Sequence, residues 1–546
     1  MPFGWLLLPM HGYLSLVLHA HLPFVRHPQH ERFLEESWLF EAITESYIPL
    51  LQLLQKWEED GLNVRLTLTL TPTLCSMLQD PLLQDRYLQR LEQIIGLVKK
   101  ELHRTRGEQE LQKLASFYHT RLIGVRDWYR DRNGDLVGAF SEFQHHGRIE
   151  IVTSAATHAL LPMLAAHRPS LTAQIRIACE HYRSCFAVEP RGIWLPECAW
   201  FEGLDVVLAE AGLRWFITDT HGILNARPQP RYAVFAPVLT PAGVAAFGRD
   251  PESAHQVWSR DRGYPGDPRY RDFYRDIGFD LDVAYVEPHL PAPGQRGFTG
   301  IKYYRITNSS AEKHLYSRDL ALKAAEEHAA HFMQERKAQI SKLNGTIDRA
   351  PVLICPYDAE LFGHWWYEGP EFLDALFRKV CQPGQLLSLI TPNDYLCRHP
   401  RLQAATPAAS SWGEQGYWGV WLNEQNEWIY PHLSQAQERM TQLANTWKNP
   451  TALQERALRQ AGRELLLAQA SDWPFIIRTG TSPEYARKQV TDRLLRFTNL
   501  FHQISGNCIN EQFLKSIEDE DNVFPNLDYR YWAEPGAGDV SAEEEV

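Results

Sequence analysis

Short apolar runs that alternate with helical patterns through the first 400 residues most constrain the fold of this chain. Continuous apolar runs separated by helices are typical of parallel strands covered on both faces, so an α/β barrel is favoured over an antiparallel sandwich. The pattern predicts seven or eight strands and leaves their exact number open. The expected strands are Leu14–Leu18, Val64–Leu70, Ile149–Thr153, Gly192–Leu195, Trp215–Thr218, Asp282–Val286, Val352–Cys355 and Leu387–Ile390.

Two interruptions separate these strands. The stretch from Pro72 to Gly147 is too long for one crossover helix, and helical periodicity in Leu82–Leu102 and Leu111–Trp128 predicts a small helical insertion. The stretch from Gly222 to Gly278 is rich in Pro, Gly, Arg and Tyr and lacks sustained periodicity, so we expect a long ordered loop region over a site.

The last part of the chain has a different character. Strand signals vanish after Pro407, and amphipathic stretches at Gln435–Trp447, Leu453–Ala470 and Pro483–Phe501 predict a helical C-terminal domain. The acidic end reads as a solvated tail. The expected organisation is a barrel in 1–71 and 147–406, a helical insertion in 72–146, a helical domain in 407–532 and a disordered acidic tail in 533–546.

The amino-acid composition disfavours several classes of function and location. A formal net charge of -12 disfavours nucleic acid as a partner but allows neutral substrates. The eight cysteines are scattered without C-x-x-C spacing, which indicates a reducing compartment, and we expect a cytoplasmic protein. The apolar N-terminus lacks the features of a signal peptide, and Met10 competes with Met1 as the start. No apolar run predicts a membrane span.

Two carboxylates follow buried apolar runs. Glu197 ends the string Gly-Ile-Trp-Leu-Pro-Glu, and Asp358 follows Val-Leu-Ile-Cys-Pro-Tyr. A glycosidase needs one acid to protonate the glycosidic oxygen and a second to attack or to activate water, and strand ends can bring such a pair together. Each acid alone is more often a helix cap or a salt-bridge partner, and Asp358 could cap a helix beginning near Ala359.

Histidines lie beside the same predicted strand ends. His19 and His21 follow the first strand, and alternation puts both on one side of the extended chain. His158 follows the third strand, so the three could line one pocket. Hydrogen-bonded core histidines are the alternative, and His-x-His is also a metal-ligand spacing. The three histidines alone therefore leave open whether the pocket binds sugar hydroxyls or a metal ion.

Four strings in order resemble glycoside hydrolase family 57, and within it the 1,4-α-glucan branching enzymes. They are His-Ala-His-Leu-Pro (19–23), Gly-Arg-Ile-Glu-Ile (147–151), Gly-Ile-Trp-Leu-Pro-Glu (192–197) and Pro-Tyr-Asp-Ala-Glu-Leu-Phe-Gly-His-Trp-Trp (356–366). The resemblance implies a distorted (β/α)7 barrel with a helical insertion and a helical C-terminal domain. It implies Glu197 as nucleophile and Asp358 as general acid/base of a retaining double displacement, with no cofactor and no metal.

The resemblance also implies a glucan cleft lined by aromatic side chains. Trp258, Trp412 and Trp421 match cleft positions of similar branching enzymes, although each could instead pack the barrel against the helical domain. The full set of expected substrate-binding residues is His19, His21, Trp38, His158, Trp258, Arg260, Trp412, Trp421, Asp472 and Trp473.

The expected reaction is cleavage of an α-1,4-glucan and re-attachment of the segment through an α-1,6 linkage. An α-amylase or 4-α-glucanotransferase on the same scaffold is the nearest alternative. A zinc-dependent deacetylase-like or mannosidase-like hydrolase, with His19 and His21 as ligands, and a non-catalytic glucan-binding protein represent other classes. We expect α-1,4-glucan as the partner and a monomer or weak homo-oligomer as the assembly.

Overall fold

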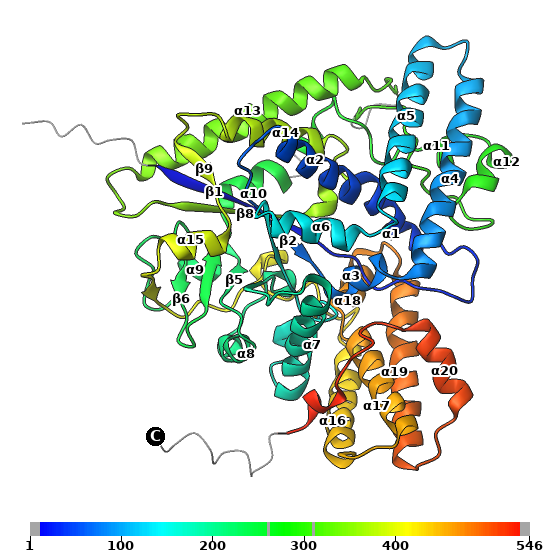
Figure 1. The fold of residues 1–546 in the computed structure, drawn as a ribbon, viewed down its shortest axis with the longest axis vertical. Coiled ribbons are helices and arrows are strands. Elements are labelled where there is room, and N and C mark those ends of the chain that lie inside the picture. Colours follow the sequence, from blue (N-terminus) through cyan, green and yellow to red (C-terminus); the bar gives the residue numbers. More distant parts are fainter. Residues whose placement is uncertain (1–10, 259–262, 308–311, 535–546) are drawn as a thin grey trace, which may run out of the picture.

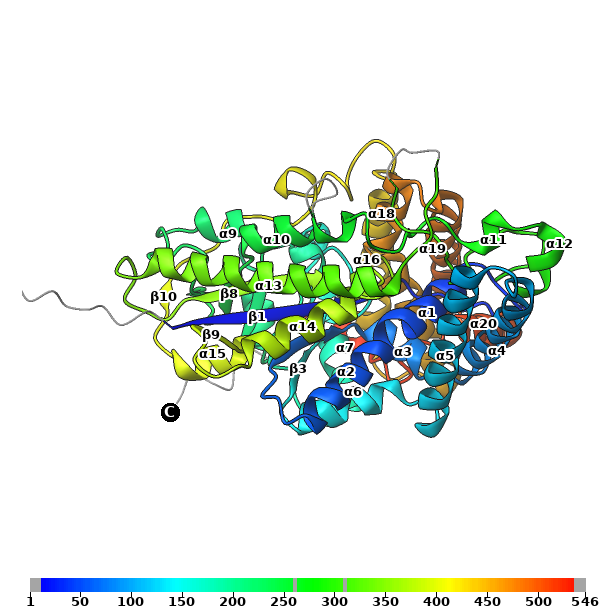
Figure 2. The ribbon, with the colours of Figure 1, turned by 90° about the horizontal axis from the view of Figure 1, so that it is seen from above.

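The computed structural model describes residues 11–258, 263–307 and 312–534. Strands and their covering helices form the larger part of the molecule, and a group of C-terminal helices lies beneath it in Figure 1. The view in Figure 2 shows α13 and α14 running along the strand β1. The expected positions of Arg260, of the start at Met1 or Met10 and of most of the tail lie outside the described residues.

Two five-stranded sheets organise the α/β part. The first has the order β3-β2-β1-β8, with β9 also paired to β1, and all its pairings are parallel. The second has the order β10-β6-β7-β5-β4 and is parallel except for the β6–β7 pair. The strands are β1 (Gly12–Ala20), β2 (Leu66–Leu70), β3 (Ile149–Val152), β4 (Gly192–Ile193), β5 (Trp215–Thr218), β6 (Val238–Leu239), β7 (Ala245–Gly248), β8 (Val352–Asp358), β9 (Leu387–Leu389) and β10 (Gln403–Ala404).

The two sheets meet at two isolated parallel bridges. Thr153, just after β3, bridges Ile193 in β4, and Arg249, just after β7, bridges Ile354 in β8. The expected strand Val352–Cys355, a continuous apolar run, is buried at every position, and Leu66–Leu70 is fully buried although leucine and threonine alternate along it. The predicted α/β class with a parallel sheet and a helical C-terminal part is confirmed, whereas the described strands do not form one continuously hydrogen-bonded barrel.

Helices cover the sheets and build the insertion. The predicted helical stretches in the insertion are the long helices α4 and α5, which pack on each other. The α-helices before the C-terminal group are α1 (Glu36–Ala42), α2 (Ile48–Glu59), α3 (Pro72–Leu78), α4 (Pro81–Arg104), α5 (Gln109–Asp131), α6 (Leu136–His145), α7 (Arg168–Phe186), α8 (Leu204–Glu210), α9 (Thr220–Leu224), α10 (Pro251–Trp258), α11 (Ile277–Asp280), α12 (Val283–Val286), α13 (Arg318–Leu343), α14 (Gly369–Val380) and α15 (Pro392–Arg398), and a π-helix at Ile43–Tyr47 joins α1 to α2.

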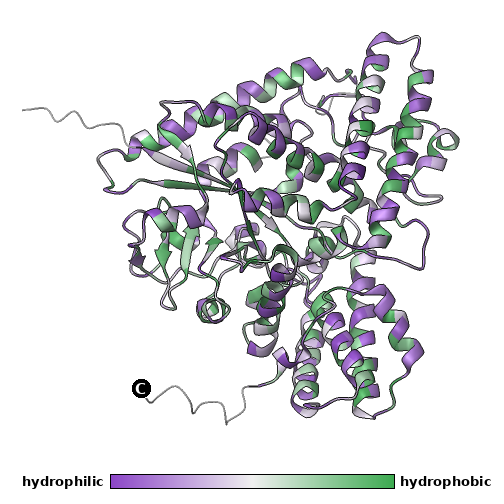
Figure 3. Cartoon of the chain, in the orientation of Figure 1, coloured by the Kyte–Doolittle hydropathy of each residue, from purple (hydrophilic) through white to green (hydrophobic). Residues whose placement is uncertain are grey.

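The C-terminal helices confirm the amphipathic pattern. They are α16 (Ile429–Thr446), α17 (Ala452–Ala468), α18 (Asp472–Thr479), α19 (Pro483–Ser505) and α20 (Glu511–Glu520). Each carries both hydrophobic and hydrophilic residues in Figure 3, because one face packs inward and the other meets solvent. No helix of the described residues is long and apolar enough to cross a membrane.

Two local predictions are wrong. The stretch Asp282–Val286 is not a strand, because the Asp282 carboxylate accepts a hydrogen bond from the Ala284 backbone and caps the short helix α12. The stretch from Gly222 to Gly278 is not simply a long loop: it contains β6, β7 and α10. Strands of two and four residues are too short to give a sustained alternation, so the sequence pattern missed them.

Candidate active site

The carboxyl ends of several strands converge on one group of polar side chains. In the parallel register of β1 and β8, His19 lies directly beside Asp358. Glu197 lies in the short turn Pro196–Cys198 that follows β4, and His158 lies in the loop after β3. The strand-end positions therefore bring together residues more than 300 positions apart in the sequence.

The backbone is left-handed at three of these positions. The φ angles are 55° at His158, 62° at Glu197 and 51° at Cys198. Non-glycine residues occupy this region at an energetic cost, and such residues concentrate where a side chain must be aimed at a functional site. The turn after β4 thus directs the Glu197 carboxyl to a position that an extended chain would not give it.

Two donors hold the Glu197 carboxylate. The indole Nε1 of Trp412 donates to Oε2 at 2.8 Å, and the hydroxyl of Ser471 donates to Oε1 at 2.9 Å. Burial raises the pKa of Glu197 to about 6, while the hydrogen bonds from Trp412 and Ser471 act in the opposite direction. The carboxyl is therefore mostly ionised at neutral pH and fixed in orientation.

A directed hydrogen-bond chain leads from the histidines to this carboxylate. His19 Nε2 and His158 Nε2 are 3.0 Å apart, and His158 Nδ1 lies 2.9 Å from the Ser471 hydroxyl. Because Ser471 donates to Glu197, its oxygen accepts from His158 Nδ1–H, and His158 Nε2 then accepts from His19 Nε2–H. Burial lowers the pKa of both histidines well below the usual range, which fits the neutral tautomers that this chain requires.

His21 has the opposite character. Its Nε2 lies 3.0 Å from Asp472 Oδ1, its Nδ1 lies 3.0 Å from the Thr71 hydroxyl, and its ring stacks on that of His158 with centroids 3.9 Å apart. Burial would lower the pKa of His21, but the charge of Asp472 and its hydrogen bond outweigh this, so the pKa is raised. The Asp472 carboxylate therefore favours the protonated form of His21.

Asp358 differs from Glu197 in its surroundings. Burial, followed by the negative charges of Glu360 and Glu197, raises its pKa well above the usual range. No hydrogen bond to the Asp358 carboxyl is present in the part of the chain that the structure describes, whereas Glu360 accepts hydrogen bonds from the His21 backbone and the Tyr47 hydroxyl. Burial and negative charge thus favour the protonated form of Asp358, whereas the hydrogen bonds from Trp412 and Ser471 partly offset the effect of burial at Glu197.

Comparison with known proteins assigns this arrangement to a family. The family model "Glycosyl hydrolase family 57" matches residues 15–405, which include all the strands except part of β1. The chain belongs to glycosyl hydrolase family 57. A second model, "1,4-alpha-glucan branching enzyme, C-terminal", matches residues 432–532, and thus the helices that supply Ser471 and Asp472 to this family 57 site. The resemblance seen in the sequence motifs is confirmed.

Relatives of this family 57 chain include branching enzymes and an amylase. A 1,4-alpha-glucan branching enzyme of Thermococcus kodakarensis, TK1436, is 31% identical over 94% of this chain and 78% of its own length. The crystal structure of that family 57 branching enzyme superposes with a TM-score of 0.87, covering 96% of this chain and 97% of its own. The structure of the alpha-amylase AmyC from Thermotoga maritima superposes with a TM-score of 0.91 at 43% identity, covering 96% and 100%.

The structure brings some of the expected site residues together and separates others. His19, His21, His158, Glu197, Trp412 and Asp472 form the connected network described above. Trp421 and Trp473 have 1% and 0% of their surface exposed, so neither ring offers a free face to a glucan here. Trp258 and Trp38 are half-buried against the hydrophobic core.

Several site residues escaped the sequence interpretation. Ser471 joins Glu197 to His158, and Trp194 stacks on His19 with centroids 4.4 Å apart and planes 13° apart. Glu360 has a pKa raised to about 6 by burial. Trp194 and Glu360 stand inside the family strings, which was a usable signal, whereas Ser471 is marked only by its place before Asp472.

The site also contains a group with the composition of metal ligands. Ligand atoms of His21, His158 and Asp472 lie within 4.8 Å of one another. Each ring nitrogen of both histidines already has a hydrogen-bond partner: Thr71 and Asp472 for His21, and Ser471 and His19 for His158. The group therefore serves as a hydrogen-bond network in this structure, and a zinc ion would have to displace several of these contacts.

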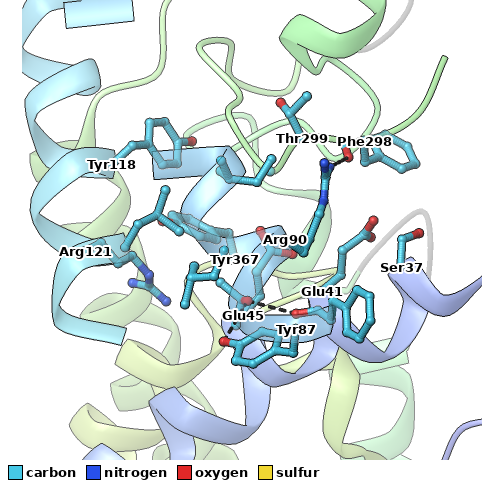
Figure 4. Close-up of a pocket in the computed structure, with 16 residues that line it drawn as sticks. Ser37, Glu41, Glu45, Tyr87, Arg90, Tyr118, Arg121, Phe298, Thr299 and Tyr367 are labelled. Atoms are coloured by element: carbon cyan, nitrogen blue, oxygen red, sulfur yellow. Dashed lines mark hydrogen bonds between the residues drawn. The ribbon is translucent and has the colours of Figure 1, made fainter. Parts of the chain in front are cut away.

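A small cavity lies between α1, the π-helix, α4 and α5 (Figure 4), and the charged side chains of its wall are Glu41, Glu45, Arg90 and Arg121. Glu45, on the π-helix, pairs with Arg271 at 3.0 Å and with His364 Nδ1 at 2.7 Å. The cavity has a volume of about 60 Å³, which is room for a few waters. His364 lies in the segment after Asp358, so its contact with Glu45 helps to hold that segment in place.

Proposed function

We propose that this chain is a 1,4-α-glucan branching enzyme acting by a retaining double displacement. Glu197 attacks C1 of an α-1,4-linked glucosyl unit while Asp358 protonates the departing oxygen. In the second half, Asp358 takes the proton from a C6 hydroxyl of an acceptor glucan, and the glucosyl–Glu197 bond breaks as the α-1,6 bond forms. Attack by water at this step gives hydrolysis instead.

The observation that carries this proposal is that the two carboxyl groups, Glu197 and Asp358, differ in their hydrogen bonds and in the charges around them. Glu197 is ionised and held by Trp412 and Ser471, as a nucleophile must be. Burial and neighbouring negative charge favour the protonated form of Asp358, which is the form that a general acid requires. After Glu197 becomes an ester its charge is lost, so one cause of the raised pKa of Asp358 disappears and the same group becomes a better base.

The proposed scaffold is a distorted (β/α)7 barrel. Seven strands (β1, β2, β3, β4, β5, β7 and β8) run parallel in the described residues, and the two isolated bridges lie at the seams between the sheets. We propose the domain limits given above: a barrel in 1–71 and 147–406, an insertion in 72–146 and a C-terminal domain in 407–532. The contacts of Ser471 and Asp472 with the strand-end residues support a role for the C-terminal domain in the site.

The proposed substrate is an α-1,4-glucan in the cytoplasm, handled by a monomer or weak homo-oligomer. Transfer to an acceptor in about 55 M water requires an oriented acceptor, and effective molarities of ~10⁵ M or more are within reach of good positioning. We propose Trp258 and Trp412 as residues that position the glucan, His19, His21, His158 and Asp472 as residues at the reacting sugar, and Trp38 as a weaker candidate. Because Trp421 and Trp473 are buried, we propose that they act by packing behind the residues that meet the glucan. Arg260 is proposed from the sequence alone.

An α-amylase is the second candidate. The 43% identity to a chain described as an alpha-amylase favours it, while the match of the branching-enzyme C-terminal model and the branching enzymes among the relatives favour transfer. Incubation with amylose followed by ¹H NMR separates the two. New α-1,6 linkages are expected, and a product containing only reducing ends or redistributed linear chains would contradict branching.

The nucleophile assignment is tested by Glu197→Gln. We expect loss of measurable turnover with retained amylose binding, because glutamine keeps the shape of the side chain and its amide oxygen can still accept from one of the two donors, but the neutral amide cannot attack C1. Glu202→Gln, at a nearby exposed glutamate, is the matched control and should retain activity. A zinc-dependent mechanism would instead show loss of activity with a chelator, and activity of E197Q equal to that of E202Q would exclude Glu197 as nucleophile.

A further inference from the structure

A second, larger pocket opens at the other end of the strands. It has a volume of about 800 Å³, within the range of small-molecule sites. Its walls include β3 and the residues that precede β4 and β5, so it lies at the amino ends of strands whose carboxyl ends supply the catalytic groups. Below the Thr153–Ile193 bridge, β3 and β4 are not paired, and the pocket occupies this opening between the sheets.

A tryptophan spans the opening. The indole Nε1 of Trp215 in β5 donates to Glu150 Oε1 in β3 at 3.2 Å. The ring crosses β4 at Gly192, where a Cβ atom would lie 2.2 Å from a Trp215 ring atom. Glycine at this position is therefore required for the contact, and the contact fixes Glu150 at the pocket wall.

Two arginines stand side by side at the same opening. Gly192 pairs with Trp215, so the preceding residues Arg191 and Arg214 are neighbours, and the Arg214 backbone donates to the Arg191 carbonyl at 2.8 Å. Both side chains are exposed pocket residues. Adjacent like charges on neighbouring strands repel each other, and neither guanidinium has a carboxylate partner within 4.0 Å in the described ranges.

The other two arginines of the pocket are already paired. Arg65 lies 3.4 Å from Asp394, and Arg183 lies 3.2 Å from Glu189. The unpaired charge is thus concentrated at Arg191 and Arg214. In a chain whose formal net charge is -12, this is a local site for an anion.

The rest of the pocket wall carries polar side chains, and among the described residues it has no exposed Phe, Tyr or Trp ring. Gln144 accepts from the Ile151 backbone and the Tyr182 hydroxyl through Oε1, while its amide Nε2 is buried with no hydrogen-bond partner among the described residues. Burial raises the pKa of Glu150 to about 7, so this carboxyl is protonated in about half of the molecules at neutral pH. Tyr182, the aromatic residue of the wall, is 3% exposed and gives no face for stacking.

We propose that this pocket binds a sugar phosphate, with the phosphate on Arg191 and Arg214 and the sugar hydroxyls on Gln144 and Glu150. The planar guanidinium donates two parallel hydrogen bonds to phosphate oxygens, and a bound dianion removes the repulsion between the two arginines. A neutral glucan chain is disfavoured, because the wall lacks the exposed ring on which such chains stack. The inference does not depend on the activity proposed above.

Isothermal titration calorimetry of the full chain at low salt tests the proposal, with glucose 6-phosphate, inorganic phosphate and maltose as probes. We expect saturable binding of one glucose 6-phosphate, weaker binding of phosphate and none of maltose. Each of Arg191→Gln and Arg214→Gln should weaken glucose 6-phosphate binding at least about tenfold, since a hydrogen bond to a charged group contributes ~1.5–3 kcal/mol.

The control is Arg487→Gln, an exposed arginine on α19 far from β4 and β5 in the sequence, which should bind as the unaltered chain does. Turnover of amylose should be unchanged in the arginine variants, because they lie at the end of the strands away from Glu197 and Asp358. Absence of glucose 6-phosphate binding at millimolar concentration, equal binding by all variants, or preferred binding of maltose would each overturn the proposal. None of these results bears on whether the chain branches amylose.

Discussion

Replacing Ser471 by alanine tests how the site controls its proposed nucleophile. The change removes the hydroxyl that donates to Glu197 Oε1 at 2.9 Å and accepts from His158 Nδ1. Ser471 is the residue before helix α18, yet its side chain makes no capping hydrogen bond, so the helix start does not depend on it. The substitution therefore acts mainly on the carboxylate and on the histidine chain behind it.

The size of the effect follows from the lost hydrogen bond. A hydrogen bond to a charged group contributes ~1.5–3 kcal/mol, and one pKa unit corresponds to about 1.4 kcal/mol, so the pKa of Glu197 should rise by ~1–2 units. From its present value of about 6, the ionised fraction at pH 7 would fall from about 90% to between about 50% and 10%. Because only the ionised form attacks, activity at pH 7 should fall ~2–10-fold and recover as the pH rises.

The measurement is kcat/KM on amylose across the pH range. The unaltered enzyme should show a bell-shaped profile, with an acid limb near pH 6 from Glu197 and an alkaline limb at higher pH from deprotonation of Asp358. In Ser471→Ala the acid limb should move upward. Ser184→Ala, at an exposed hydroxyl that donates to the His181 carbonyl, is the control. An acid limb that stays in place in Ser471→Ala would refute the electrostatic argument.

Two further predictions concern stability. Burial raises the pKa of Glu360 from 4.5 to about 6, so the unfolded chain ionises first and stability falls as pH rises between these values. Glu360→Gln, whose amide oxygen can still accept from Tyr47, should raise the free energy of unfolding by ~2 kcal/mol above pH 6 and leave it unchanged below about pH 4.5. Thermal unfolding at both pH values measures this difference, and equal gains at both would contradict the prediction. Trp421→Ala should lower the free energy of unfolding by ~3–5 kcal/mol, because the ring is 1% exposed. The more conservative Trp421→Phe should leave the KM for amylose nearly unchanged. A large rise in KM for Trp421→Phe without a drop in Tm would instead indicate a glucan contact.

The sequence predicts the parts of this fold in which one local pattern corresponds to one environment. The run Val352–Cys355 is apolar throughout and buried at every position, so its continuous apolar character identifies it as an internal parallel strand. The segment Asp282–Val286 is also apolar after its first residue, but the hydrogen bond from the Ala284 backbone to the Asp282 carboxylate caps a helical turn there. The strands β6 and β10, of two residues each, depend on their neighbours for pairing, and no window of sequence reveals that.

The candidate site likewise contains residues that local sequence patterns predict and residues that they do not. Glu197, Asp358 and the histidines could be found because each follows a recognisable strand, and the family strings fix their order. The bond between Ser471 and Glu197 joins residues 274 positions apart, so it depends on the docking of the C-terminal helices and leaves no local signature. Trp421 was expected at a cleft because tryptophans suit both sugar stacking and core packing, and only the three-dimensional surroundings distinguish the two roles.

The contribution of α18 to the site has a consequence for synthesis of the protein on the ribosome. All strands are complete by Ala404, but Ser471 and Asp472 emerge later, at ~5–20 residues per second. Until they dock, Glu197 lacks one of its two donors and His21 lacks its carboxylate partner. A nascent chain that has already folded its sheets therefore still lacks part of the hydrogen-bond network around the proposed nucleophile, and this network is completed only when the helical segment docks at the strand ends.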